Sequence, residues 1–324
     1  MKIRLLILVL ILSLALISET DLAKEDLEGK VKAITSSTFK ADTDSEELVW
    51  ELKSTISAKT IKIFDVKGNL IEEKNFMEDG TIFSSSVYEY DESGNNSKII
   101  DSDGAGIKYC YKYDYDEDGN MLEEKQFGAN DDLLGKYIFE YDEKGYKIKS
   151  QEIDTDGNVT TTYKYVNNND GKPVEQKIFD GDEQRNHTKI EYDENGNLTK
   201  SWLYDEDDNL KETNILTYNE NDKPVTMISE NKIDEVIKKY DYVYNDIDKV
   251  SQVELYENAV LVRSEDYEYN EHGDDKWMKF DLEGTITTYR YEYKYDDQGN
   301  WAEKIEYKND EPDIKYIREI TYYE

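Results

Sequence analysis

The sequence predicts an all-β protein in which one β-hairpin is repeated along the chain. Three observations carry this prediction. A tyrosine-centred phrase recurs about every 26 residues, turn signals follow each other at half that spacing, and tyrosines occupy alternate positions between the turns. A fixed period between about 20 and 50 residues is typical of a repeat array built from one supersecondary unit. We therefore expect a long antiparallel meander or solenoid-like ribbon, coiled by strand twist.

The recurring phrase is a tyrosine and an acidic residue followed by Gly-Asn, and it is clearest in residues 192–197. Glycine adopts positive φ without a Cβ clash and asparagine tolerates it, so each phrase predicts a chain reversal. Successive anchors are separated by 26, 25, 26, 24, 27, 26, 26, 25 and 26 residues. The anchors are Phe64, Tyr90, Tyr115, Tyr141, Tyr165, Tyr192, Tyr218, Tyr244, Tyr269 and Tyr295.

A second reversal falls about half a period after each anchor. Asp-Gly between two extended runs is a strong hairpin signal, and weaker turn residues replace it in some units. Each unit is therefore predicted to be strand, turn, strand, turn, with about 8 or 9 residues per strand. The signals are Asp79-Gly80, Asp103-Gly104, Asp156-Gly157, Glu283-Gly284, Asp207-Asp208-Asn209 and Asn258.

Tyrosines alternate along the strands that lead into the anchors. Alternate side chains share one face of a strand, so each run places a ladder of phenol rings on one side of the sheet. We expect the ladders of neighbouring units to lie side by side, where cross-strand aromatic pairs contribute roughly 0.2–1 kcal/mol each. The clearest ladders are Tyr109, Tyr111, Tyr113 and Tyr115, then Tyr240, Tyr242 and Tyr244, and finally Tyr289, Tyr291, Tyr293 and Tyr295.

The chain begins with a predicted signal peptide, residues 1–18. Lys2 and Arg4 precede an apolar run of 13 residues, Leu5 to Ile17, which as a helix spans only about 20 Å. An uncleaved N-terminal anchor is the alternative. Residues 19–63 are then a polar tether and an atypical first β unit, and residues 64–324 hold about ten tandem hairpin repeats. Such a leader predicts a secreted, periplasmic or cell-surface protein.

The charge of the chain narrows the choice of partners. Forty Lys and Arg against 75 Asp and Glu give a net charge of −35. Nucleic acid and anionic lipid surfaces are disfavoured, because the field over most of the surface repels them. The single cysteine, Cys110, cannot form a disulfide within the chain.

Candidates for catalysis and for metal binding are few. The two histidines, His187 and His272, lie 85 residues apart in or beside predicted turns, where surface residues are more common than general bases. Residues 114–119 match positions 1, 3, 5 and 6 of an EF-hand loop, but Lys125 stands at position 12 and the repeated turn explains the pattern better. We assign no catalytic residue, no metal site and no cofactor.

Aromatic side chains beside Asp and Asn allow a second interpretation of the ladders. Exposed tyrosines together with Trp202, Trp277 and Trp301 could stack sugars, because an aromatic ring with a polar tip suits an amphipathic surface. The structural interpretation, in which the rings pack the sheet, is favoured, and the sequence does not identify the ligand-binding residues.

The Tyr-Asp-x-x-Gly-Asn phrase, followed by an apolar residue such as Leu198, resembles the tyrosine-aspartate repeats of the rearrangement-hotspot (RHS) family. The resemblance covers residues 27–323, and the segment 27–32 is similar to the first segment of small exported bacterial proteins built only from such repeats. Large family members wrap β-ribbons into a shell around a toxin or present the repeats on a cell surface. The family period is roughly 20 residues, so the longer period here departs from it and the toxin-enclosing role is not carried over.

These observations together predict a non-enzymatic exported protein that acts as a binding or envelope scaffold. Its expected partner is a protein or glycan at the cell envelope. A carbohydrate-binding or carbohydrate-active envelope protein is the alternative, and a calcium-dependent adhesive module is third.

Overall fold

The computed structural model describes residues 21–25, 27–42, 48–52 and 57–324. The predicted signal peptide, residues 1–18, lies outside the described residues. No helix among the described residues is long and apolar enough to cross a membrane. Apart from one short 3₁₀-helix, the regular elements are strands.

The elements are η1 (Ala23–Glu25), β1 (Val31–Asp42), β2 (Val49–Leu52), β3 (Lys59–Phe64), β4 (Leu70–Phe76), β5 (Ile82–Tyr90), β6 (Asn96–Asp103), β7 (Lys108–Tyr115), β8 (Met121–Phe127), β9 (Leu133–Tyr141), β10 (Lys147–Ile153), β11 (Val159–Asn167), β12 (Pro173–Asp180), β13 (Glu183–Tyr192), β14 (Leu198–Tyr204), β15 (Leu210–Tyr218), β16 (Pro224–Asn231), β17 (Val236–Tyr244), β18 (Val250–Glu257), β19 (Val260–Tyr269), β20 (Asp275–Leu282), β21 (Thr285–Tyr295), β22 (Trp301–Lys308) and β23 (Glu311–Tyr322).

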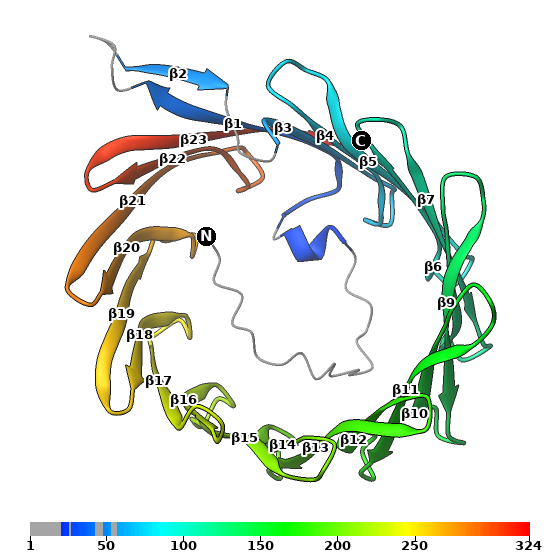
Figure 1. Cartoon of the computed structure of the whole chain (residues 1–324). Coiled ribbons are helices and arrows are strands. Elements are labelled where there is room, and N and C mark those ends of the chain that lie inside the picture. Colours follow the sequence, from blue (N-terminus) through cyan, green and yellow to red (C-terminus); the bar gives the residue numbers. More distant parts are fainter. Residues whose placement is uncertain (1–20, 26, 43–47, 53–56) are drawn as a thin grey trace.

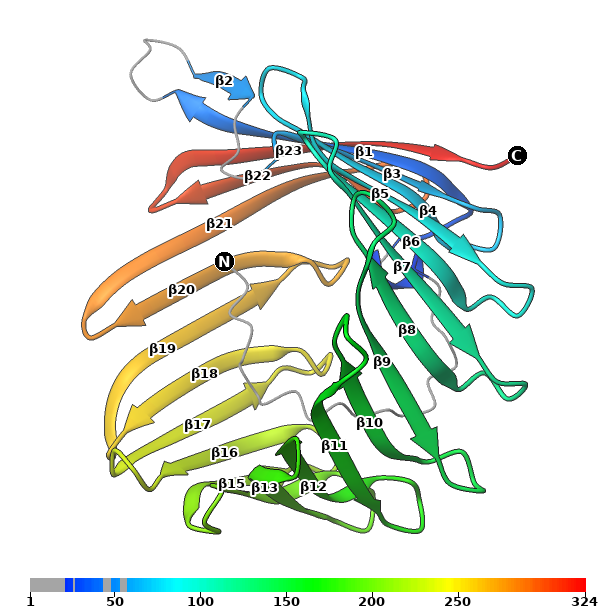
Figure 2. The same cartoon turned by 45° about the vertical axis from the view of Figure 1, so that its right-hand side comes forward.

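The strands form one closed antiparallel ring. From β3 to β23 each strand pairs with the next, and β1 pairs with β23 on one side and β3 on the other. Ile34, for example, lies opposite both Ile320 and Lys62. The strand β2 pairs with the far end of β1 and lies outside this 22-stranded ring. Figure 1 shows the ring along its axis, and Figure 2 shows it obliquely, turned by 45°.

The prediction of an all-β hairpin meander is confirmed, but the prediction of an open ribbon is wrong. Twenty-two strands at about 4.8 Å each give a circumference of roughly 106 Å. The twist of the strands coils a sheet of this width until its two edges meet. An open ribbon would leave β1 and β23 with unpaired backbone groups along two strands of 12 residues each. Closure pairs these groups and removes both edges.

Each anchor is followed by a five-residue turn that an Asp or Asn side chain closes. In the turn 116–120, Asp116 N donates to Asn120 O at 2.9 Å, and Gly119, with φ 85°, donates to Asp116 O at 3.2 Å. The Asp116 carboxylate accepts from Asn120 N at 2.8 Å and from Asn120 Nδ2 at 2.9 Å. The side-chain and backbone hydrogen bonds from Asn120 lower the pKa of Asp116. The repeated phrase thus encodes a complete local hydrogen-bond set.

The second turn of each unit differs in length: most are of five or two residues, and residues 232–235 make a four-residue turn between β16 and β17. Five-residue turns of the same type follow β4, β6, β8, β10 and β14. Two-residue turns in which both residues have positive φ join β18 to β19, β20 to β21 and β22 to β23: Asn258 and Ala259, Glu283 and Gly284, and Asn309 and Asp310. Two positive φ values match the right-handed twist of the flanking strands.

One anchor differs from the sequence prediction. Asn167, and not Tyr165, stands at the anchor position, because it ends β11 opposite Pro173 as Tyr218 ends β15 opposite Pro224. The separations from Tyr141 and to Tyr192 then become 167 − 141 = 26 and 192 − 167 = 25. Asn167 Nδ2 donates to Lys147 O at 2.9 Å, so an amide takes the place of a phenol.

The tyrosine faces of the strands line the inside of the ring. Phe64, the first anchor, packs against Leu22 and Leu27 of the N-terminal segment, and η1 of that segment lies within the ring in Figure 1. The Tyr90 hydroxyl likewise lies 2.8 Å from the Asp21 carboxylate of that segment and shares its hydrogen between this carboxylate and the Leu70 carbonyl. Residues that lie opposite each other on paired strands share one face of the sheet, so the other anchors are on the same face as Phe64. Every tyrosine ladder therefore points inward, and the alternate residues point outward.

The ladders of neighbouring units do not lie side by side as the sequence suggested. A strand with few tyrosines stands between two ladders, which places them about 9.6 Å apart at twice the strand spacing. Stacking between tyrosine rings among the described residues runs along one strand instead. Tyr240 and Tyr242 have centroids 6.4 Å apart, and Tyr293 and Tyr295 are 5.9 Å apart.

Anchor hydroxyls join each unit to the one before it. Seven tyrosine anchors donate to a backbone carbonyl 19 or 20 residues earlier at 2.6–3.0 Å, as Tyr218 does to Leu198 O at 2.7 Å. The accepting carbonyl belongs to the residue beside the bulge that follows the anchor turn. Each phenol therefore provides a hydrogen-bond donor at the bulge, where the register between two paired strands shifts.

Replacing Tyr218 by Phe is expected to lower the free energy of unfolding by about 1–2 kcal/mol, because it leaves the Leu198 carbonyl without this donor. The matched control is Tyr163→Phe, since Tyr163 lies on the same inner face and its hydroxyl has no hydrogen-bond partner among the described residues. Urea unfolding followed by circular dichroism measures both. Equal losses in the two variants would contradict the proposed role of the anchor hydroxyl.

Candidate functional site

The inner wall at the seam of the ring holds the best packed part of the protein. Phe64 is fully buried, and Val31 and Ile34 are 1% and 3% exposed. Leu22 and Leu27 of the N-terminal segment pack against this cluster from inside the ring. The core thus forms where the first and last strands meet, rather than in a layer between sheets.

The N-terminal segment is fastened to the inner wall by polar contacts as well. Leu22 N donates to Gly68 O at 3.0 Å, and the Asp21 carboxylate accepts from Leu70 N at 3.0 Å. Further along, Glu28 N donates to Asn300 Oδ1 at 2.7 Å, and Asn300 Nδ2 donates back to Glu28 O at 2.9 Å. The segment therefore bridges β4 on one side of the seam and the turn before β22 on the other.

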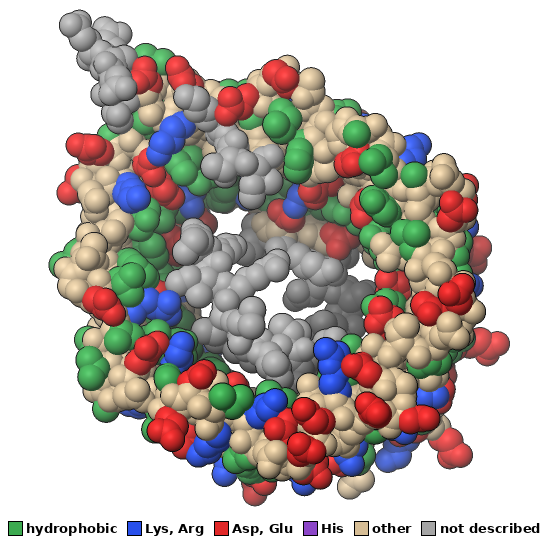
Figure 3. Space-filling model, viewed as in Figure 1, with side chains coloured by type: hydrophobic (Ala, Val, Ile, Leu, Met, Phe, Trp, Pro, Cys, Tyr) green, Lys and Arg blue, Asp and Glu red, His purple; other side chains and the backbone are tan. Residues whose placement is uncertain are grey.

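Elsewhere the inner wall carries tyrosines with charged groups among them. Arg263 and Glu265 form an ion pair at 3.2 Å whose side chains are 17% and 8% exposed, and Tyr267 donates to the Glu265 carboxylate. Lys304 lies over the rings of Tyr291 and Tyr316. Figure 3 shows hydrophobic, acidic and basic side chains interspersed around the ring.

Burial raises the pKa of Tyr115 and Tyr242, two phenols of the ladders. Burial, with the charges of Asp91 and Glu124 added, raises the pKa of Tyr115 to about 12. Burial beside Tyr240 and Tyr244 raises the pKa of Tyr242 to about 12 as well. These two phenols therefore stay neutral at any physiological pH.

Alkaline titration is expected to unfold the ring. The folded pKa of Tyr115 and Tyr242 exceeds the unfolded value of about 10, so the stability they contribute is complete below pH 10 and is lost as the pH rises through about 12. Phenolate absorbance and far-ultraviolet circular dichroism, measured together, should change in one step in that window. Ionisation of all tyrosines near pH 10 with the fold intact would contradict this expectation.

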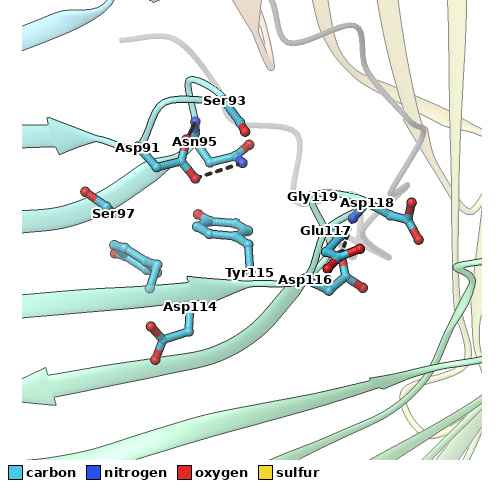
Figure 4. A pocket seen from close by; sticks show the side chains of 11 residues that line it. Asp91, Ser93, Asn95, Ser97, Asp114, Tyr115, Asp116, Glu117, Asp118 and Gly119 are labelled. Atoms are coloured by element: carbon cyan, nitrogen blue, oxygen red, sulfur yellow. Dashed lines mark hydrogen bonds between the residues drawn. The ribbon is translucent and has the colours of Figure 1, made fainter.

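Residues 114–119, the EF-hand-like stretch, form the end of β7 and the anchor turn that follows it, as the repeat predicts. Its residues line a shallow hollow of about 490 Å³ between the turns 91–95 and 116–120, shown in Figure 4. The carboxylate oxygens of Asp116 accept hydrogen bonds within their own turn, while Asp114 lies 3.3 Å from Lys125 Nζ. Within the described ranges, no three His, Cys, Asp or Glu residues are arranged to hold a metal ion.

The structure does not bring the two histidines together. The His187 ring stacks on Tyr204 at 4.5 Å with Nδ1 3.2 Å from Asp208 Oδ1, and the His272 ring stacks on Tyr295 at 3.9 Å. His187 is 6% exposed within β13, so the expectation of a surface residue beside a turn is wrong for it, whereas His272 is exposed in the anchor turn as predicted. Cys110 is half-buried on the outward face of β7 and is not in a disulfide.

The three tryptophans named from the sequence lie on opposite faces of the wall. Trp202 and Trp277 point outward, and Trp277 lines a hollow of about 390 Å³ with Arg290. Trp301 points inward opposite Tyr295, and the Arg318 guanidinium lies 3.5 Å from the centre of its ring. Sequence reasoning singled out Trp301 but missed the cation stacked on it.

Comparisons with known proteins give weak likenesses. No protein-family model matches the chain, and no curated protein matches it. Among solved structures, TcdB2-TccC3 without its hypervariable C-terminal region is similar at a TM-score of 0.33 and 11% identity over 85% of this chain. A porin-like protein from Bacteroides uniformis is similar at a TM-score of 0.27 and 11% identity, over 91% of this chain and 98% of that one. The chain spans 18% of the length of TcdB2-TccC3.

Proposed function

We propose that this protein is a non-enzymatic, exported binding scaffold of the cell envelope, which presents the inner wall of its ring to a ligand. The observation that carries the proposal is the inward direction of every tyrosine ladder. Aromatic rings with polar tips form an amphipathic surface, and such rings are used for recognition wherever one side is apolar and the other wet. The leader-like residues 1–18 and the RHS-like phrase support export and a scaffold role.

The side chains on the outer face of the ring favour water over lipid as its surroundings. A barrel wall that faces lipid carries an apolar band about 25 Å tall. The outward positions here hold ion pairs on neighbouring strands, such as Lys98 with Glu89 and Lys149 with Glu140, both at 2.8 Å, among exposed apolar side chains such as Val243. We therefore propose a secreted, periplasmic or cell-surface location outside the lipid.

A carbohydrate ligand is the second candidate, and the inner position of Trp301 favours it. Its indole lies in the same wall as the ladder of β21, where Asp274 accepts a hydrogen bond from Tyr295 at 2.6 Å. Rings that can stack on the apolar face of a sugar and carboxylates that accept from its hydroxyls thus occur together. Calcium-dependent adhesion remains the third proposal.

A glycan array with three versions of the protein tests the proposal. The unmodified protein is compared with Tyr291→Ser/Tyr293→Ser on the inner face and with Tyr204→Ser/Tyr256→Ser on the outer face, each with and without calcium. We expect ligands whose signal is lost only in the inner-face variant. Loss only in the outer-face variant would contradict the proposal, and release of new sugar ends from a bound glycan would show an enzyme instead.

A further inference from the structure

Lys304 and Arg318, two cations on the inner wall, lack the ion pairs that many other basic residues of the chain form, as does Lys147 over the rings of Phe139 and Tyr165. Lys304 on β22 and Arg318 on β23 are both partly buried. Neither forms an ion pair or a hydrogen bond with a described residue. By contrast, Lys294 and Lys315, on the outward face of β21 and β23, both pair with Glu303. In a chain of net charge −35, two neighbouring, partly buried cations without a paired carboxylate need a separate explanation.

The strand register places these two cations side by side. Tyr316 lies directly opposite Lys304, and Arg318 is the next inward residue along β23. Diagonal neighbours of this kind lie about 7–8 Å apart, within the reach of two long side chains. Burial lowers the pKa of both, and the charge of Arg318 acts on Lys304. The two positive charges therefore converge on one area of the inner wall.

Aromatic rings hold both cations so that their donors remain free. Arg318 stacks on Trp301, and a guanidinium stacked on a ring keeps its N–H groups in the ring-parallel plane, open to a further acceptor. The Lys304 ammonium lies 4.4 Å from the centre of the Tyr291 ring and 5.7 Å from that of Tyr316. The planar guanidinium of Arg318 and the ammonium group of Lys304 can together bind one carboxylate.

Acidic groups border the same area. The charges of Asp274, Asp275 and Glu306 act on Lys304 without forming an ion pair with it. Burial raises the pKa of Glu306. These oxygens can accept hydrogen bonds from hydroxyl groups, and they disfavour a ligand with several negative charges. The surroundings therefore fit a ring that carries hydroxyls and one carboxylate.

We propose that Lys304, Arg318 and Trp301 form a binding site on the inner wall for a sugar that carries one carboxylate, of the uronic-acid class. The two cations bind the carboxylate, the rings of Trp301 and Tyr291 contact the apolar face of the sugar, and the bordering acids accept from its hydroxyls. This inference rests on the proposed role of the inner wall and names the class of its ligand.

Glucuronate is the probe, and the quenching of tryptophan fluorescence is the readout, with Trp301→Phe to assign the signal. Four compounds separate the contributions: glucuronate, its uncharged methyl ester, glucose and benzoate. We expect saturable binding of glucuronate at about millimolar Kd or better. The methyl ester and glucose should bind at least about tenfold more weakly because they lack the charge, and benzoate should do so because it lacks the hydroxyls.

Two double variants complete the test. Lys304→Met/Arg318→Leu removes the inner cations, and we expect at least a tenfold loss of glucuronate affinity. Lys164→Met/Arg290→Leu is the matched control, because these outward cations lie over Phe179 and Tyr307 in the same way. Circular dichroism checks the folding of each. Because the ester comparison uses the unmodified protein, it decides the question even if the inner variant unfolds.

Equal affinity for glucuronate and its methyl ester, or no saturable binding of glucuronate, would overturn this site. Unchanged affinity in a folded inner variant would overturn it as well. The broader proposal fails separately, if the glycan array gives no ligand that depends on the inner tyrosines.

Discussion

Deleting half of a repeat should prevent the ring from closing, whereas deleting a whole repeat should leave a smaller closed ring. Removal of residues 192–217 takes out β14 and β15, which leaves 20 strands and an antiparallel seam. Removal of residues 193–204 takes out β14 alone, so every later strand reverses its direction relative to β1. The strands β1 and β23 would then run parallel, and their present register could not form.

Proximity of the two seam strands is the most direct readout. Thr35 lies opposite Glu319, so cysteines at these two positions, with Cys110 replaced by Ser, should react with a short bifunctional thiol reagent within one chain. We expect the cross-link in the full-length protein and in the 26-residue deletion, and its loss in the 12-residue deletion. Size-exclusion chromatography should show association of the latter through its unpaired edges. A cross-link in both deletions would contradict seam pairing as described.

Replacing Phe64 by Ala should destabilise the protein by about 3–5 kcal/mol, the largest effect expected of a single substitution here. The ring of Phe64 is fully buried where β1, β3, β23 and the N-terminal segment meet. Its backbone carbonyl accepts from the Tyr323 hydroxyl at 2.6 Å, and this bond is retained in the variant. The loss therefore reports the cavity left by the side chain.

The control for this prediction is Phe83→Ala, because Phe83 is 45% exposed on the outward face of β5. It should cost no more than about 0.5–1 kcal/mol. Urea unfolding of both variants gives the two free energies. If the two losses were similar, the seam would not be the centre of stability.

The sequence predicts the hairpins well because they are local. Each turn is closed by residues within five positions of one another, as Asp116 and Asn120 show, and these residue types have few alternatives. The error at Tyr165 could have been detected from the same local turn residues. Gly171 stands four residues after Asn167, with φ 80°, whereas no glycine stands four residues after Tyr165. The prediction weighted the tyrosine above the glycine.

Closure could not be predicted in this way, because it depends on the number, twist and coil of all strands together. Nothing near Val31 or Tyr322 distinguishes a terminal edge strand from a seam strand. The site on the inner wall could be predicted from the sequence only in part. Lys304 and Arg318 are ordinary strand residues in the sequence, but extending the period-two pattern through the predicted turns would place both on the tyrosine face. Their missing ion pairs appear only in the structure.

The pairing of the first strand with the last has a consequence for the order of folding. Ala33 and Thr321, in contact across the seam, are separated by 288 positions in the chain. Joining such distant residues directly costs about 3 kcal/mol more loop-closure entropy than joining the ends of a ten-residue loop. Hairpins that form one after another shorten that path, so the seam is the last contact to form. The ring therefore keeps two open edges, along β1 and along the strand most recently added, until β23 has paired with β1.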